Sequence, residues 1–181
     1  MFIAFIHLGI KAKLSSSSAR EELLILYNTV IQAANPVFQK YEGFIDKYLT
    51  DGLMVLFYGT AEQTVDCIIE ITQLIKKINI HRQEQSLPAI HISSGIHYGR
   101  LMMGTIGEPE RMDTTVISDV VNISSRMHSY ATEKKVNTII SESVREQISE
   151  SYWRTHTCFY YGKIKFYGKK NLINVYEVDL L

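Results

Sequence analysis

The 181-residue chain has few cysteines, no excess of either charge and no long hydrophobic run. Nineteen basic residues balance nineteen acidic ones, which argues against non-specific binding to nucleic acid or to an anionic membrane. Cys67 and Cys158 form no CxxC pair, so we expect two reduced thiols rather than a disulfide or a metal site. No apolar run approaches the roughly 18 residues of a membrane-spanning helix, and the apolar start of the chain lacks a signal-peptide layout. We therefore expect a cytoplasmic protein with a single domain over residues 1–181.

Strand and helix signals alternate along the chain and predict an α+β fold. The apolar run at residues 2–8 is typical of a buried strand. Apolar residues at helical spacing follow up to residue 34, and Pro36 is expected to interrupt or kink that helix. Asp51-Gly52 lies between two apolar runs and predicts a hairpin of residues 44–49 and 53–58. The remaining predictions are a helix at 61–80, strands at 89–97 and up to Met103, an arm and helix over 104–130, a strand at 137–140, a helix at 142–149, and strands at 156–168 and 172–179. The order βαββαββαβαββ favours a sheet sandwich over a doubly wound parallel fold.

The most informative segment is residues 104–127, GTIGEPERMDTTVISDVVNISSRM. It resembles the class III adenylate/guanylate cyclase catalytic domain, in which an arm of the form GxxGxPERMDYT runs into a helix of the form GDxVNxAxRM. The segments GFIDK at 43–47 and GIHYGRLMMG at 95–104 extend the resemblance in the same order along the chain. The resemblance implies a ferredoxin-like βαββαβ core with additional strands and helices. It also implies a head-to-tail dimer with nucleotide sites at the subunit interface, where ATP or GTP is converted to a cyclic nucleotide and pyrophosphate.

The resemblance also implies a set of nucleotide-binding residues. Lys47 and Thr115 stand where family members that select ATP hold the purine, and a lysine can donate to the N1 acceptor of adenine. Asn122 and Arg126 match the pair that positions the ribose and stabilises the phosphate in the transition state. Their i, i+4 spacing puts both on one helix face, and arginine suits a phosphate that accumulates charge. We therefore expect ATP as the ligand.

Two positions depart from the family pattern. The family binds two Mg²⁺ or Mn²⁺ ions with two aspartates, and Asp51 matches the one in the hairpin turn. The first-strand aspartate is replaced by His7, no acidic residue precedes Glu21, and imidazole is a poor ligand for Mg²⁺. Tyr167 stands in place of the lysine that contacts the β- and γ-phosphates. The sequence thus predicts a weakened metal site.

These departures leave three interpretations open. The first is an adenylate cyclase-like domain that binds ATP but turns it over poorly as a homodimer. The second is a working adenylate cyclase, either through unusual metal ligation by His7 and Asp51 or in a heterodimer whose partner supplies both metal aspartates. The third is a dimerisation or regulatory module without a nucleotide. None of the three involves nucleic acid, nor membrane contact by this domain.

Overall fold

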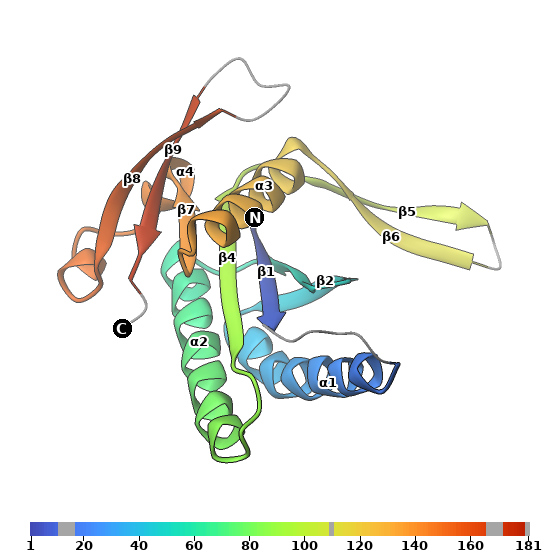
Figure 1. Cartoon of the computed structure of the whole chain (residues 1–181). Helices are drawn as coiled ribbons and strands as arrows, with labels where there is room; N and C mark the ends of the chain where they lie inside the picture. The colour runs from blue at the N-terminus through green and yellow to red at the C-terminus, as the bar shows by residue number, and fades with distance from the viewer. Residues whose placement is uncertain (11–16, 109–110, 166–171, 180–181) are drawn as a thin grey trace.

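The computed structural model describes residues 1–10, 17–108, 111–165 and 172–179 (Figure 1). A seven-stranded sheet forms the body, and a separate two-stranded arm projects from it. The strands are β1 (Phe2–Ile10), β2 (Gly43–Leu49), β3 (Gly52–Phe57), β4 (Ile90–Tyr98), β5 (Met102–Glu108), β6 (Arg111–Ile117), β7 (Thr138–Ser141), β8 (Cys158–Lys165) and β9 (Leu172–Val178). The helices are α1 (Ser17–Lys40), α2 (Ala61–Glu84), α3 (Asp119–Lys134), α4 (Glu142–Arg145) and the short 3₁₀ helix η1 (Tyr152–Arg154).

The first six elements form the predicted ferredoxin-like βαββαβ core. The sheet order is β2-β3-β1-β4-β7-β9-β8, so the core strands lie in the order 4-1-3-2 when read from β4. Strand β1 pairs antiparallel with both β3 and β4, and β2 pairs antiparallel with β3. Strand β7 extends the core by pairing parallel to β4. This arrangement confirms the predicted α+β class.

Side chains of β1 alternate between two covered faces of the sheet, as the period of a strand requires. Phe2, Ala4, Ile6 and Leu8 belong to the larger hydrophobic core, to which α1 and α2 contribute. Ile3 and Phe5 belong to a smaller core with Val120 of α3. Because both faces of β1 are covered, the strand needs apolar side chains on both, which explains its continuous apolar run.

Helix α3 packs closely against the sheet at β1 and β4. The Ser124 hydroxyl lies 2.9 Å from the carbonyl oxygen of Ile3 and 2.8 Å from that of Gly95. A Cβ atom on Gly95 would come within 2.3 Å of the backbone nitrogen of His128, so a side chain there is sterically excluded. These contacts fix the position of α3 against β1 and β4.

Three elements differ from the sequence predictions. Helix α1 continues through Pro36 to Lys40, so the proline does not interrupt it, and the buried side chain of Phe38 anchors the last turn. The arm is a β-hairpin, β5–β6, whose β6 strand was not predicted. Its β5 residues are all exposed, so no apolar alternation indicated a strand. Helix α4 ends at Arg145 instead of residue 149.

Among the residues described, no helix combines the length and hydropathy needed to cross a bilayer.

Candidate functional site

The end of β1 meets the β2–β3 turn and brings two predicted site positions together. His7 lies opposite Gly52 in the β1–β3 register, and the Leu8 amide donates to the Asp51 carbonyl at 2.8 Å. A Cβ atom on Gly52 would lie 2.0 Å from the carbonyl oxygen of Ile6, so this tight approach requires glycine. The result is a turn that presents Asp51 beside His7.

The side chains of these two residues face each other. The Nδ1 atom of His7 lies 3.2 Å from Oδ2 of Asp51, with the His7 side chain 19% exposed and the Asp51 side chain 57% exposed. The same Nδ1 atom is buried and makes no well-aligned hydrogen bond in the described structure. The contact is therefore an electrostatic one, attractive when the imidazole is protonated and weak when it is neutral.

His128 on α3 adds a second imidazole, which sequence reasoning did not place in the site. Its ring centroid lies 5.4 Å from that of His7, and its Nε2 atom is buried without a partner among the described residues. Burial lowers the pKa of His128, and the neighbouring His7 lowers it further. Helical spacing was the signal that could have placed His128 against the sheet, because it lies one turn after Ser124, which faces β1.

The donor set at this position does not match a site for two Mg²⁺ or Mn²⁺ ions. Such ions prefer several oxygen ligands, usually carboxylates. Here Asp51 supplies one carboxylate, and His7 supplies an imidazole nitrogen where the family uses the other. In the described ranges, no group of three or more His, Cys, Asp or Glu residues lies close enough to hold a metal ion.

The predicted purine-binding residues lie where β2 meets the arm. The Lys47 ammonium donates to the carbonyl oxygen of Thr114 at 3.0 Å, and Thr115 follows directly in β6, opposite Gly104. The register of β2 shifts between Ile45 and Lys47, and a bulge of this kind re-aims a side chain. The Asp46 carboxylate is only 2% exposed, with Oδ2 3.7 Å from the Lys47 ammonium. The fold thus places the Lys47 ammonium against the backbone of β6, one residue from Thr115.

The predicted catalytic residues lie on the first half of α3. Ser118 caps this helix: its hydroxyl accepts from the Val120 amide at 3.1 Å and donates to the Arg100 carbonyl at 2.8 Å. Family members carry glycine at this position, and here serine ties the start of α3 to the β4–β5 connection. Asn122 is exposed and Arg126 is half-buried, one turn apart on the helix.

The remaining phosphate-site position, Tyr167, lies outside the described residues. The structure places His7 beside Asp51 and the Lys47 ammonium against β6, which carries Thr115, while Asn122 and Arg126 lie on α3. We call His7 and Asp51 the metal set, and Lys47, Thr115, Asn122 and Arg126 the purine and ribose set, after the roles that the resemblance implies.

A family model described as the adenylate and guanylate cyclase catalytic domain matches residues 5–177. The chain belongs to this family. Among curated relatives, an adenylate cyclase of Anabaena cylindrica is 34% identical over 178 residues, covering 93% of this chain and 35% of the relative. Adenylate cyclase 1 of Rhizobium meliloti is 22% identical, covering 91% of this chain and 25% of that protein. The cyclase-family chain thus spans about a third or less of the length of these relatives.

Solved structures share the cyclase fold. The adenylyl cyclase CyaB from P. aeruginosa matches with a TM-score of 0.77 and 24% identity, covering 98% of this chain and 93% of that chain. A bacterial light-regulated adenylyl cyclase matches with a TM-score of 0.81 and 19% identity, covering 99% of this chain and 51% of that chain. At these identities the likeness establishes the fold of this cyclase-family domain.

Proposed function

We propose that this cyclase-family domain binds ATP at the interface of a head-to-tail dimer and turns it over poorly as a homodimer. The observation that carries the proposal is the approach of the His7 imidazole to within 3.2 Å of the Asp51 carboxylate. In the family, that position holds two carboxylates that bind divalent cations. In this chain a group that is neutral or positively charged takes the place of one of them.

The adenine-binding half of the site supports nucleotide binding. The Lys47 ammonium lies against the Thr114 carbonyl where β2 meets the arm, one residue before Thr115, so both predicted purine-binding positions belong to this junction. Lys47 would donate to N1 of adenine, whereas N1 of guanine carries a hydrogen and needs an acceptor. The bound nucleotide we therefore propose is ATP rather than GTP.

The helix residues have proposed roles at the sugar and phosphate. Asn122 would orient the ribose, and Arg126 would contact the phosphate that gains charge when the ribose 3′-oxygen attacks it. Both residues follow the serine cap that fixes the start of α3. A positioned asparagine and arginine would bind the nucleotide even where turnover is slow.

Poor turnover follows from the charge at the His7–Asp51 pair. When bound, Mg²⁺ or Mn²⁺ would lower the pKa of the 3′-hydroxyl and neutralise the triphosphate. The present donor set offers one carboxylate, and His7 competes with any cation for it when protonated. Losing a single electrostatic group in an active site commonly costs about 10²–10³ in rate, and losing one of two metal carboxylates should cost more.

The arm supports assembly into a dimer. Its exposed apolar side chains are Met102, Met103, Ile106, Met112 and Ile117. Scattered apolar residues on a surface are ordinary, whereas a projecting hairpin that carries five of them is a good candidate for an interface. A second copy of this chain would cover the arm in the proposed homodimer.

A heterodimer is a second candidate, favoured by the separation of the residues into two sets. The purine and ribose set is retained on this chain, and the metal set is altered at His7. A partner that supplied both aspartates would complete one site with the Lys47, Thr115, Asn122 and Arg126 of this chain.

The test is cyclic AMP formation from ATP by the purified chain, at a concentration where sedimentation shows a dimer. Mg²⁺ and Mn²⁺ are compared, and Asp51→Ala serves as the control. We expect ATP to raise the melting temperature, since a ligand that binds only the folded state stabilises it, with little or no cyclic AMP formed. Rapid turnover that Asp51→Ala abolishes would overturn the impaired homodimer. If ATP is not turned over and does not raise the melting temperature, the interpretation that remains is a dimerisation module without a nucleotide.

A further inference from the structure

A second cluster of polar groups lies away from the cyclase-family site, where α4, η1 and the start of β8 meet. These elements line an open surface pocket of about 290 Å³. Its lining is rich in cationic and hydrogen-bonding side chains: Arg145, Trp153, Arg154, Thr155, His156 and Thr157, with Cys158. The residues predicted for nucleotide binding are absent from this lining.

The positive charge of the pocket comes from two guanidinium groups. Arg154 is exposed and lines the pocket. Arg145 is half-buried, with its guanidinium 5.3 Å from the ring centroid of Tyr176. Its Nη2 atom lies 3.7 Å from Glu150, but the Glu150 side chain is 81% exposed, and such a surface pair holds an arginine weakly. A dianion in the pocket could therefore replace this contact.

The other pocket groups do not oppose an anion. Burial raises the pKa of Cys158 to about 11, although Arg145 acts in the opposite direction, so the thiol is uncharged at neutral pH. The indole Nε1 of Trp153 is buried and makes no hydrogen bond to any described residue.

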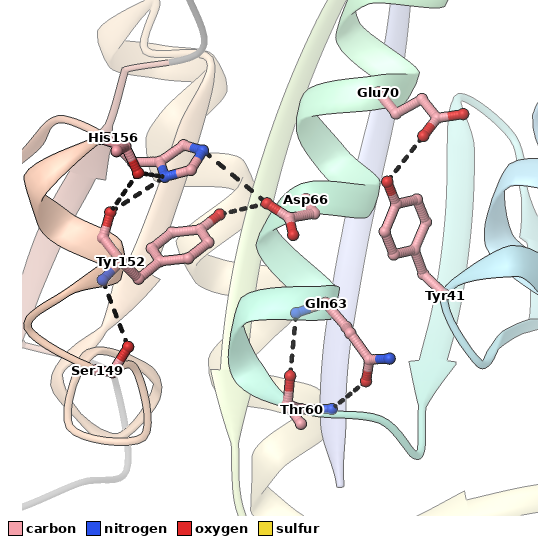
Figure 2. Close-up of polar contacts among 9 residues, drawn as sticks. Tyr41, Thr60, Gln63, Asp66, Glu70, Ser149, Tyr152 and His156 are labelled. Atoms are coloured by element: carbon pink, nitrogen blue, oxygen red, sulfur yellow. Dashed lines mark hydrogen bonds and ion pairs between the residues drawn. The ribbon is translucent and has the colours of Figure 1, made fainter.

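The wall of the pocket is held in place by contacts with α2 (Figure 2). The Tyr152 hydroxyl donates to Asp66 at 2.6 Å, as Figure 2 shows. The Ser149 amide donates to Glu62 at 2.9 Å. His156 stacks on Tyr152 with ring centroids 4.0 Å apart and planes 10° apart, and its Nε2 atom lies 4.0 Å from Asp66. Residues on both sides of Trp153 and Arg154 are thus anchored, which lowers the entropy lost when a ligand binds.

We propose that this pocket binds a phosphate group, through the guanidinium groups of Arg145 and Arg154. Guanidinium groups match the geometry and charge of phosphate, and the volume accommodates a phosphate group with a small substituent. The ligand is either free phosphate or a small phosphomonoester. This site would be separate from the nucleotide site of the domain.

The chain contains its own probe, because Trp153 is its single tryptophan. The experiment titrates sodium phosphate into the purified chain at fixed ionic strength, balanced with sodium chloride, and follows tryptophan fluorescence. A parallel series records the melting temperature, which must rise if phosphate binds the folded state. Glycerol phosphate and acetate are titrated in the same way, to separate free phosphate from a phosphomonoester and phosphate from a carboxylate.

The decisive variant is Arg154→Gln, which removes an exposed charge and leaves the contacts of Arg145 intact. We expect a saturable signal for the wild type and a dissociation constant at least about tenfold higher in the variant, because a charge-assisted hydrogen bond is lost. Lys163→Gln is the matched control: it removes one positive charge from an exposed position on β8, outside the pocket lining. Its phosphate affinity should equal that of the wild type.

Three results would overturn the proposal. The first is a wild type that shows neither a saturable fluorescence change nor thermal stabilisation. The second is an equal loss of affinity in Arg154→Gln and Lys163→Gln, which would indicate a general charge effect. The third is an acetate response as strong as the phosphate response, which would indicate a carboxylate site. Because the nucleotide-site residues are unchanged in both variants, failure here would leave the ATP proposal intact.

Discussion

The Nδ1 atom of His7 lies 3.2 Å from the Oδ2 atom of Asp51, across the junction of β1 with the β2–β3 turn. The backbone around the pair is closely specified, because Leu8 bonds to Asp51 and the approach excludes any side chain at residue 52. We propose that this is the location at which the cyclase family binds its metal ions. The change lies in the chemistry of one side chain.

The first prediction concerns His7→Asp. We expect this substitution to raise cyclic AMP formation with Mn²⁺ by roughly 10²–10³-fold, because it restores the second carboxylate of the family site. The same variant should lose stability without metal, because two carboxylates then face each other, and it should regain stability when Mn²⁺ is added. Product formation and melting temperature are measured with and without Mn²⁺.

His7→Asn is the matched control, since it is similar in size to aspartate and carries no charge. It should show neither the gain in activity nor the metal-dependent stabilisation. If His7→Asp is stabilised by Mn²⁺ but stays inactive, the altered residue at position 167 becomes the next candidate for the cause of the inactivity. If Mn²⁺ stabilises His7→Asn as much as His7→Asp, the assignment of position 7 to the metal site is wrong.

The sequence predicted the core elements well, for a physical reason. Buried strands and amphipathic helices repeat their apolar residues with a fixed period, and the Asp51-Gly52 turn has a strong local signal. The arm lacked such a signal: β5 is exposed on both faces, so the hydrophobic period that normally marks a strand is absent. Its second strand, β6, is defined by pairing rather than by local pattern.

The site could be predicted only where a family motif supplied the residues. The structure places His7 beside Asp51 and the Lys47 ammonium beside the Thr114 carbonyl, and the roles that the motif implies for these residues stay predictions. It also placed His128 beside His7, which no motif indicated, because that contact depends on how closely α3 approaches the sheet at Gly95. Contacts between distant segments depend on packing, and packing is not readable from local sequence.

The second prediction tests purine choice with Lys47→Glu. A glutamate offers an acceptor in place of a donor, so ATP should lose its thermal stabilisation of the domain and GTP should gain some. We expect about a tenfold weaker affinity for ATP, since a charge-assisted hydrogen bond is replaced by an unfavourable contact. Melting curves with each nucleotide measure the shift.

Lys163→Glu makes the same change of charge on β8, away from the proposed purine pocket. It should leave the order of preference for ATP over GTP unchanged. Equal effects of the two variants would point to a general electrostatic influence. Unchanged ATP binding in Lys47→Glu would remove Lys47 from the proposed pocket.

The third prediction tests the arm as a dimer interface. Ile106→Asp places a charge on the exposed apolar surface of β5 and should weaken self-association at least about tenfold, because a buried charge without a partner is costly. Sedimentation velocity over a range of protein concentrations measures the change. Leu24→Asp, at an exposed apolar position on α1, should not affect association. A dimer that survives Ile106→Asp with unchanged affinity would place the interface elsewhere.

The fourth prediction concerns the pH dependence of stability at the junction of α1 and α2. The Glu70 carboxylate accepts hydrogen bonds from the Lys40 ammonium at 2.5 Å and from the Tyr41 hydroxyl at 2.8 Å, the latter drawn in Figure 2. These bonds lower the pKa of Glu70, so the folded state binds its proton less readily than the unfolded state. The stabilisation is present at neutral pH and is lost as pH falls through the acidic range.

Glu70→Gln should therefore cost about 0.5–1 kcal/mol at neutral pH, as for a partly exposed ion pair. Between about pH 5 and pH 3 the difference from the wild type should shrink, as measured by urea unfolding. Glu84→Gln, at an exposed carboxylate near His81, is the control and should cost less at neutral pH. A Glu70→Gln difference that stays constant down to pH 3 would show that the carboxylate charge contributes nothing to this contact.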